Sequence, residues 1–246
     1  MSDRIWGLTL DSVENLPRIL AVLKALPKRA TVRIVCDPGV SAHYYEGPCE
    51  AIAQAADILL APVDSFAMKQ YNTHGYVRRF QSYLGVLGKY SKYCEAINEA
   101  NGDWLGKNVA LKATSVLPLI KAAGLKSVMT YYWSENLIEW ATRNQIYGDL
   151  TLLSYYPNAS SCPMVLGQAL RFLQSTFLGT VTGISEYGTQ DGDGNEGDLT
   201  MKQNLVKSIE RRPSNDRDCV FGGYWTGYQD LCVSGALLPT FMEVWK

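Results

Sequence analysis

Short apolar runs alternate with amphipathic segments along the whole chain, a pattern that predicts parallel strands joined by helices rather than two stacked antiparallel sheets. The second run, TVRIV, is stopped soon after by Pro38-Gly39, as expected where a strand passes into a loop. Eight strands are predicted in this way, within residues 4–10, 31–39, 56–65, 93–99, 126–133, 149–158, 180–185 and 218–225.

Apolar positions at helical spacing fill the intervals between these runs. The first helix is predicted to begin at Ser12, with Pro17 tolerated near its first turn. Its apolar positions recur at 3-4-3 spacing, which is typical of a helix with one buried face: Val13, Leu16, Leu20 and Leu23. Further helices are predicted over residues 105–123, from Pro163 onward, over 199–212 and at the end of the chain up to Trp245.

The count of eight strands and eight helices leaves no linker or repeat, and 246 residues match the roughly 250 of a single (β/α)8 barrel. We therefore expect one barrel domain spanning residues 1–246, with short loops, rather than an open doubly wound sheet. A formal net charge of -1 disfavours nucleic acid and anionic lipid as partners, and no apolar run reaches membrane-spanning length. We expect a monomer.

No basic segment followed by an apolar core stands at the N-terminus, so the chain is expected to be cytoplasmic if it is complete. A secreted protein whose signal peptide had been removed would look the same. The six cysteines show no C-x-x-C spacing, which argues against a zinc site. Cys94 and Cys219 read as buried thiols, whereas Cys36 with Cys49, or Cys219 with Cys232, are possible pairs for a disulfide in an oxidising compartment.

The acidic loop DGDGNEGD begins like the calcium loop of an EF-hand. Its sixth place holds Glu196 where a sharp turn needs Gly, and its twelfth holds Lys202 where a bidentate Glu is required. We therefore expect a solvated loop here, and no metal or cofactor.

Two glutamates stand where predicted strands end. Asn98-Glu99 closes the run that begins at Tyr93, and Glu186 follows the run Thr180–Ser185. A single Glu at a strand end is more often solvated or ion-paired than catalytic. Two at the same end of a barrel favour paired-carboxylate chemistry on a glycosidic bond, with one acid and base and one nucleophile.

These residues resemble the clan A superfamily of retaining glycoside hydrolases, whose pattern is Asn-Glu after strand 4 and Glu after strand 7. Matching positions are Asn98-Glu99, Tyr156 in SYYP, Glu186 in ISEYG, Trp225 in GGYW and Arg33 in TVRIV. The resemblance implies that Glu99 is the acid and base, that Glu186 is the nucleophile and that Asn98 binds the sugar 2-hydroxyl. No histidine stands in strands 5 or 6, where several of these families have one, so no individual family is assigned.

The neighbours of Glu186 follow from the same resemblance. Arg33 and Tyr156 beside Glu186 would lower its pKa, while Glu99 needs a drier site to stay protonated. Arg33 is equally compatible with an ion pair inside the barrel that does not touch substrate. Strand parity places Ser154 and Tyr156 on one face. Between Tyr155 and Tyr156, the motif of the resembling superfamily favours Tyr156.

Aromatic and polar loop residues supply the remaining candidates. Trp225 is predicted to form the floor under the sugar at the cleavage position. Trp104 and Trp133 are expected either to line neighbouring positions or to pack on their own helices. His74 and Asp37 are candidates for contacts with sugar hydroxyls, although a structural role is the stronger expectation for both.

The sequence thus predicts a retaining β-glycoside hydrolase that cleaves β-linked oligo- or polysaccharides by double displacement, with internal cleavage favoured by short loops. One alternative is a carbohydrate-binding barrel without turnover. The other is a phosphate-binding barrel isomerase or aldolase, which would require a catalytic lysine at a strand end. The glycines of FGGYWTG suit a phosphate, but the adjacent bulky Tyr224 and Trp225 would occlude it.

Overall fold

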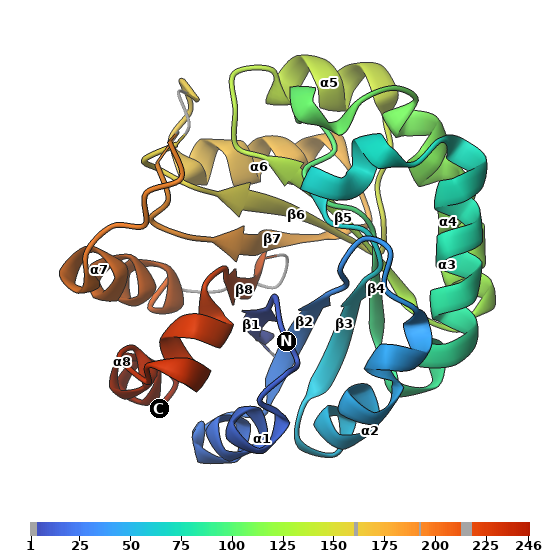
Figure 1. Ribbon diagram of the computed structural model, residues 1–246. Helices are drawn as coiled ribbons and strands as arrows, with labels where there is room; N and C mark the ends of the chain where they lie inside the picture. Colours follow the sequence, from blue (N-terminus) through green and yellow to red (C-terminus); the bar gives the residue numbers. More distant parts are fainter. Residues whose placement is uncertain (1–3, 160–161, 192, 213–217) are drawn as a thin grey trace.

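Eight parallel strands close into a barrel in which each strand pairs with the next and β8 pairs with β1 (Figure 1). The computed structural model describes residues 4–159, 162–191, 193–212 and 218–246, without the side chains of 218–223. The predicted (β/α)8 fold is confirmed. The strands are β1 (Trp6–Leu10), β2 (Ala30–Val35), β3 (Asp57–Ala61), β4 (Tyr93–Ile97), β5 (Lys126–Tyr132), β6 (Leu150–Tyr155), β7 (Val181–Tyr187) and β8 (Asp218–Tyr224).

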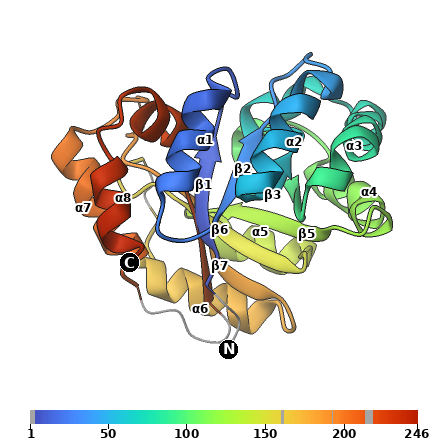
Figure 2. The ribbon, with the colours of Figure 1, turned by 90° about the horizontal axis from the view of Figure 1, so that it is seen from below.

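Helices follow the strands and lie outside the barrel, as Figure 2 shows from a second direction. They are α1 (Leu16–Ala25), α2 (Glu46–Ala55), α3 (Thr73–Leu87), α4 (Val109–Ala122), α5 (Leu137–Asn144), α6 (Leu166–Thr176), α7 (Leu199–Glu210) and α8 (Leu238–Val244). Single-turn segments precede several of them, including η2 (Ser65–Gln70) and η4 (Asp103–Leu105), and a π-helical turn, η5 (Tyr228–Val233), follows β8. No helix in the described ranges is long and apolar enough to cross a membrane.

Alternate side chains along the strands belong to two separate apolar layers. In β3, Ile58 and Leu60 join the large core between strands and helices, whereas Leu59 and Ala61 join a smaller cluster built mainly from strand residues. Successive side chains of a strand point to opposite faces, so this smaller cluster fills the inside of the barrel. It supports the polar side chains that stand nearer the carboxyl ends of the strands.

Several element boundaries differ from the prediction. Helix α1 begins at Leu16 rather than Ser12, with Pro17 at its start, and α6 begins at Leu166 rather than Pro163. Helix α4 begins at Val109 rather than Leu105, because Gly106 (φ 81°) and Asn108 (φ 60°) take left-handed backbone conformations that a continuous helix cannot contain.

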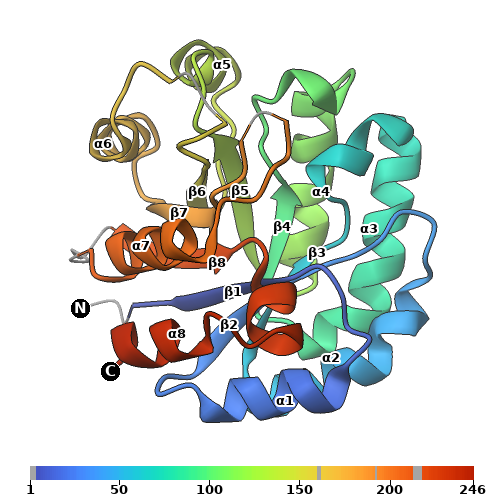
Figure 3. The same ribbon diagram turned by 60° about the vertical axis from the view of Figure 1, so that its left-hand side comes forward.

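The first strand and the last helix lie side by side (Figure 3). The ring centroids of Trp6 and Trp245 are 5.4 Å apart, and the Trp245 indole donates a hydrogen bond of 3.0 Å to Glu210. Glu210 also accepts from Tyr187 at 2.8 Å and pairs with Arg4 at 3.1 Å. These contacts hold α7 and α8 against β1 and β7.

Neither of the two possible disulfide pairs is present among the described cysteines. Cys36 and Cys49 are buried free thiols, and Cys232 is also free, while the side chain of Cys219 lies outside the described residues. Cys94 is a buried thiol, as predicted.

Candidate active site

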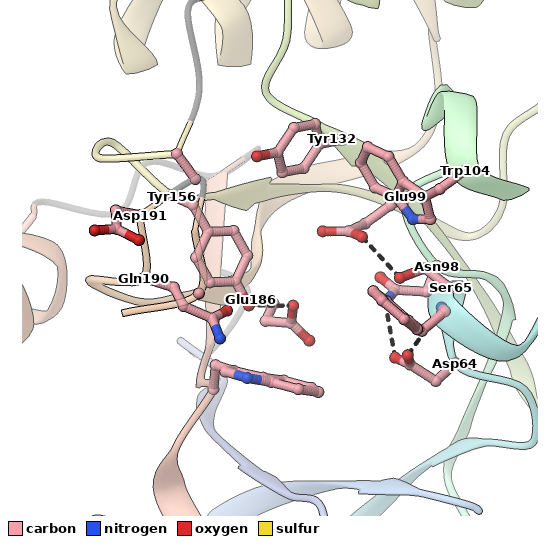
Figure 4. A pocket seen from close by; sticks show the side chains of 14 residues that line it. Asp64, Ser65, Asn98, Glu99, Trp104, Tyr132, Tyr156, Glu186, Gln190 and Asp191 are labelled. Carbon is pink, nitrogen blue, oxygen red and sulfur yellow. Dashed lines mark hydrogen bonds between the residues drawn. The ribbon is translucent and has the colours of Figure 1, made fainter. Parts of the chain in front are cut away.

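Glu99 and Glu186 lie in one cavity at the carboxyl ends of the strands (Figure 4). Glu99 comes two residues after β4, and Glu186 is the penultimate residue of β7. Their side chains reach into the cavity from different sides of the barrel mouth. The cavity has a volume of about 380 Å³ and is lined by Asp64, Ser65, Phe66, Asn98, Glu99, Trp104, Tyr132, Tyr156, Ala159, Glu186, Gln190, Asp191, Gly194 and Trp225.

Glu99 adopts a left-handed backbone conformation with φ 56°, which is uncommon for a residue other than glycine. The conformation is held on its carboxyl side, because the Ala100 amide donates to the Thr130 carbonyl at 2.8 Å. Ser65 Oγ donates to Glu99 Oε2 at 2.8 Å. The turn therefore aims a buried carboxyl, 6% exposed, into the cavity.

Glu186 is held by two donors from neighbouring parts of the barrel. Arg33 Nη1 lies 2.6 Å from Glu186 Oε2, and the Tyr156 hydroxyl donates to Oε1. The side chains of Ser154 and Tyr156 therefore both point into the barrel, on the one face that strand parity predicted for them. With both oxygens occupied, the Glu186 carboxylate has a fixed orientation.

Arg33 is fully buried and does not line the cavity. Its Nε and Nη2 donate to Glu95 Oε2 at 2.9 and 2.8 Å, and Thr130 Oγ1 donates to Glu95 Oε1 at 2.6 Å. Both sequence readings of Arg33 thus describe part of the arrangement: it is an interior ion pair, and one of its partners is Glu186.

Burial raises the pKa of both cavity glutamates. Burial raises the pKa of Glu186 to about 7, although the Arg33 charge and the Tyr156 hydrogen bond oppose it. Arg33 and Tyr156 therefore contact Glu186 as the sequence predicted. Desolvation outweighs their effect, so the expected net lowering of the Glu186 pKa does not occur. The pKa of Glu99 is raised well above its ordinary value by burial and by the charge of Glu186. Removing a proton from Glu99 while Glu186 is ionised would place two negative charges in one dry cavity.

Asn98 contributes an unused acceptor to the cavity. Its Nδ2 donates to Asp64 Oδ1 at 3.3 Å, while its buried Oδ1 has no hydrogen-bond partner among the described residues. Buried polar atoms are nearly always paired with protein or water, so this acceptor is available to a donor inside the cavity.

Aromatic rings line the cavity around the two carboxyls. Trp104 and Tyr132 pack edge to face with centroids 5.1 Å apart, and both stand near Glu99 in Figure 4. Trp225 follows β8 directly and is half-buried in the wall of the same cavity. Trp104 and Trp225 thus lie where the sequence interpretation placed them.

Three other candidates lie away from the cavity. His74 is exposed at the start of α3. Trp133 is 8% exposed, donates from its indole to the Met164 carbonyl at 2.8 Å and packs on Tyr155 with centroids 4.9 Å apart. Tyr155 points outward because it alternates with the inward Tyr156. None of these three residues lines the cavity, so the structure gives no support to substrate contacts by them.

Asp37 lies beside the cavity that holds Glu99 and Glu186 rather than in it. It lines an adjoining cavity, and its Oδ2 accepts from the Tyr45 hydroxyl at 3.0 Å. The Tyr45 oxygen in turn accepts from the Asp37 amide at 2.8 Å.

The acidic loop after β7 forms one wall of the cavity of Glu99 and Glu186 through Gln190, Asp191 and Gly194. Asp191 Oδ1 accepts from the amides of Asp193 and Asn195 at 3.0 and 2.8 Å, which folds the loop on itself. Within the described ranges, no group of three or more His, Cys, Asp or Glu side chains is arranged to hold a metal ion.

The sequence interpretation missed Asp64, Ser65 and Glu95. Asp64-Ser65 follows β3 as Asn98-Glu99 follows β4, so the same rule of polar residues at strand ends would have found them. Glu95 is a carboxylate in the middle of the apolar run YCEAI, which is itself a signal of a buried ion pair.

Comparison with known proteins finds the same fold at low sequence identity. No family model and no curated protein sequence matches the chain. A glycoside hydrolase family 5 enzyme from Prevotella bryantii is 12% identical, with a TM-score of 0.69 over 99% of this chain and 96% of that one. An endo-β-1,3-glucanase of family 128 from Amycolatopsis mediterranei, in complex with laminarihexaose, is 11% identical, with a TM-score of 0.61 over 98% and 99%. A glucosidase from Croceicoccus marinus is 12% identical, with a TM-score of 0.65 over 98% and 67%. At 11–12% identity, these likenesses show the barrel fold alone.

Proposed function

We propose that this protein is a retaining β-glycoside hydrolase acting on β-linked oligo- or polysaccharides. The observation that carries the proposal is the pair Glu99 and Glu186, two buried carboxyls of unequal pKa in one cavity. Two carboxyls whose environments separate their pKa values are suited to act as acid and nucleophile. The fold shared with family 5 and family 128 hydrolases supports the same assignment.

In the first step, Glu99 donates its proton to the glycosidic oxygen as Glu186 attacks the anomeric carbon. The bond to the leaving sugar breaks, and a covalent ester joins the remaining sugar to Glu186. Arg33 and Tyr156 hold the Glu186 carboxylate in position, and Tyr156 remains a donor because burial raises its pKa well above the ordinary value.

In the second step, water attacks the anomeric carbon and gives its proton to Glu99. Glu186 leaves as a carboxylate, and the product keeps the β-configuration. Asn98 Oδ1, the unused acceptor, would take the hydrogen of a sugar hydroxyl, and Trp225 would offer its indole face to the ring. The proposal requires the Glu99 and Glu186 carboxyls to stand about 5 to 5.5 Å apart when substrate is bound.

Cleavage within a chain is the mode we favour. Phe66 and Trp104 are large rings at the edge of the cavity, 76% and 37% exposed, and such rings suit sugars that extend beyond the cleavage position. The isomerase or aldolase alternative finds no support, because no lysine is among the described residues that line the catalytic cavity.

The proposal is tested with β-linked glucans, mannans, galactans and xylans, using the Glu186→Gln variant as the inactive control. Proton NMR of the first product formed should show the β-anomer before mutarotation. An α-anomer formed first would indicate inversion. Binding without any product from the panel would instead favour the carbohydrate-binding alternative.

A further inference from the structure

A second cavity of about 300 Å³ adjoins the catalytic cavity, and the two share Asp64, Phe66 and Trp225 as walls. Its other polar groups are Asp11 after β1 and Gln70 at the end of η2, together with Asp37 after β2. Both cavities therefore open at the carboxyl end of the barrel. The volume is at the lower end of the range of about 300–1,000 Å³ typical of small-ligand sites.

Two aromatic rings mark the boundary between the cavities. Phe66 is 76% exposed, and its turn is fixed because Asp64 Oδ2 accepts from the Phe66 amide at 3.0 Å. Trp225 enters from the end of β8 and lines both cavities. A large apolar ring held at the rim of a cavity offers a flat surface for the face of a sugar.

The two cavities have acidic walls. Asp11 and Asp37 line the second cavity, and Asp64 lines both. The catalytic cavity adds Glu99, Glu186 and Asp191. Among the described residues that line either cavity, there is no lysine or arginine.

The nearest cations already have partners or stand outside. Arg33 is buried and ion-paired with Glu95 and Glu186, and its Nη2 lies 3.9 Å from Asp64, which lines both cavities. Arg79 donates to the carbonyls of Asp37 and Cys36 at 2.7 and 3.1 Å and also to that of Pro62. Lys69 Nζ lies 5.7 Å from the centre of the Phe66 ring and is not among the lining residues.

We propose that the second cavity binds a further sugar unit of the substrate chain and that this unit is neutral. The inference rests on the proposed glycosidase function. Carboxylates accept hydrogen bonds from sugar hydroxyls, whereas the carboxylate of a uronic acid or a sulfate ester would face acidic walls that present no lysine or arginine side chain to it. The Tyr45 hydroxyl fixes Asp37 in the wall, so its remaining acceptor positions are presented in one orientation.

Binding to Glu186→Gln, which separates binding from turnover, tests the proposal by isothermal titration calorimetry. The neutral probes are cellotetraose, laminaritetraose, mannotetraose and xylotetraose, and the acidic probe is tetragalacturonic acid. We expect at least one neutral tetrasaccharide to bind and the acidic one to bind at least tenfold more weakly. Binding of the acidic probe alone, or of none of the five, would overturn the proposal.

Substitutions within the second cavity locate the binding. Asp37→Asn and, separately, Gln70→Ala in the Glu186→Gln background should weaken the neutral tetrasaccharide about tenfold, the effect of losing one strong hydrogen bond. Glu14→Gln is the matched control, because Glu14 is exposed in the same loop as Asp11 but lines neither cavity. Thermal unfolding of each variant establishes that it is folded. Equal affinities in the control and in both cavity variants would place the sugar elsewhere.

Charge is tested by the double substitution Asp11→Asn with Asp37→Asn. It should strengthen binding of tetragalacturonic acid while weakening that of the neutral probe. If tetragalacturonic acid binds the double variant no more tightly than before, the acidic walls are not what excludes an acidic sugar. If the cavity variants weaken sugar binding but the parent protein hydrolyses none of the sugars, only the proposed glycosidase function is contradicted. If the parent protein hydrolyses a sugar but the cavity variants bind it as tightly as before, only the role of the second cavity is contradicted.

Discussion

Arg33 Nη1 lies 2.6 Å from Glu186 Oε2, while the other two nitrogens of the same guanidinium donate to Glu95. One buried cation therefore serves three carboxylates, because Arg33 Nη2 also lies 3.9 Å from Asp64 Oδ1. Burial raises the pKa of Glu186 to about 7, and the negative charges of Asp64 and Glu95 beside the same guanidinium add to that rise. Glu95, which does not line the cavity, becomes a positioning residue for the reaction.

The first prediction concerns Glu95→Gln. Gln still accepts from Arg33 but carries no charge, so Arg33 should stabilise ionised Glu186 more strongly. The acid limb of kcat/KM, expected near the Glu186 pKa of about 7 in the parent, should move to lower pH by about one unit. Glu139→Gln, at an exposed ion pair on α5, is the control. If the acid limb of the kcat/KM profile stays at the same pH as in the parent, the role of Glu95 is purely structural.

The second prediction is that Glu186→Gln abolishes turnover and leaves the fold intact, because the change removes the nucleophile with little change in volume. Azide should partly restore activity to Glu186→Gly by taking the place of the missing carboxylate. The product, identified by NMR, should be the α-glycosyl azide. Full activity in Glu186→Gln would exclude this residue as nucleophile.

Glu99→Gln should lose less activity on substrates with activated aryl leaving groups than on natural glycosides. An aryloxide of low pKa needs little protonation, so the missing acid matters mainly for sugar leaving groups. Comparing kcat/KM for the two substrate classes measures the difference. Equal losses on both would count against the acid role.

Trp225→Ala should lower kcat/KM by the loss of a stacking surface, of order 1 kcal/mol or more. The stability loss should be smaller than for Trp140→Ala, since Trp140 packs on the buried Tyr131 with centroids 5.6 Å apart and lines neither cavity. Activity per folded molecule and thermal unfolding are measured together. If Trp225→Ala unfolds readily but the folded molecules turn over substrate normally, Trp225 has a packing role in the core and not a role in substrate binding.

Stability should depend on pH through the buried carboxyls. Burial raises the pKa of Glu210 to about 7, so the stability contributed by its protonation is complete below about 4.3, the unfolded value. That contribution is lost as pH rises through about 7, with a slope of at most about 1.4 kcal/mol per pH unit. Urea unfolding of the parent and of Glu210→Gln over this range should show the difference. A difference independent of pH would contradict the prediction.

Local patterns were sufficient for the barrel and for its two principal carboxyls. Alternating apolar runs and helical spacing depend only on neighbours in sequence, and they predicted the order of all eight strands. Strand ends can also be recognised locally, which placed Asn98-Glu99 and Glu186 at one mouth. Two-residue parity also grouped Tyr156 with Ser154 on one face, while the choice of Tyr156 over Tyr155 came from the motif.

Only the tertiary structure decided which side chains meet across the barrel. Glu95 and Arg33 are 62 positions apart, and Ser65 and Glu99 are 34 apart, so no local pattern contains these contacts. The outward packing of Trp133 and the exposure of His74 likewise follow from the placement of whole helices. The pKa of Glu186 was decided by burial, which outweighs the two donors that the sequence had identified. Desolvation depends on every atom that closes around a group, and that enclosure exists only once the strands have joined into a barrel.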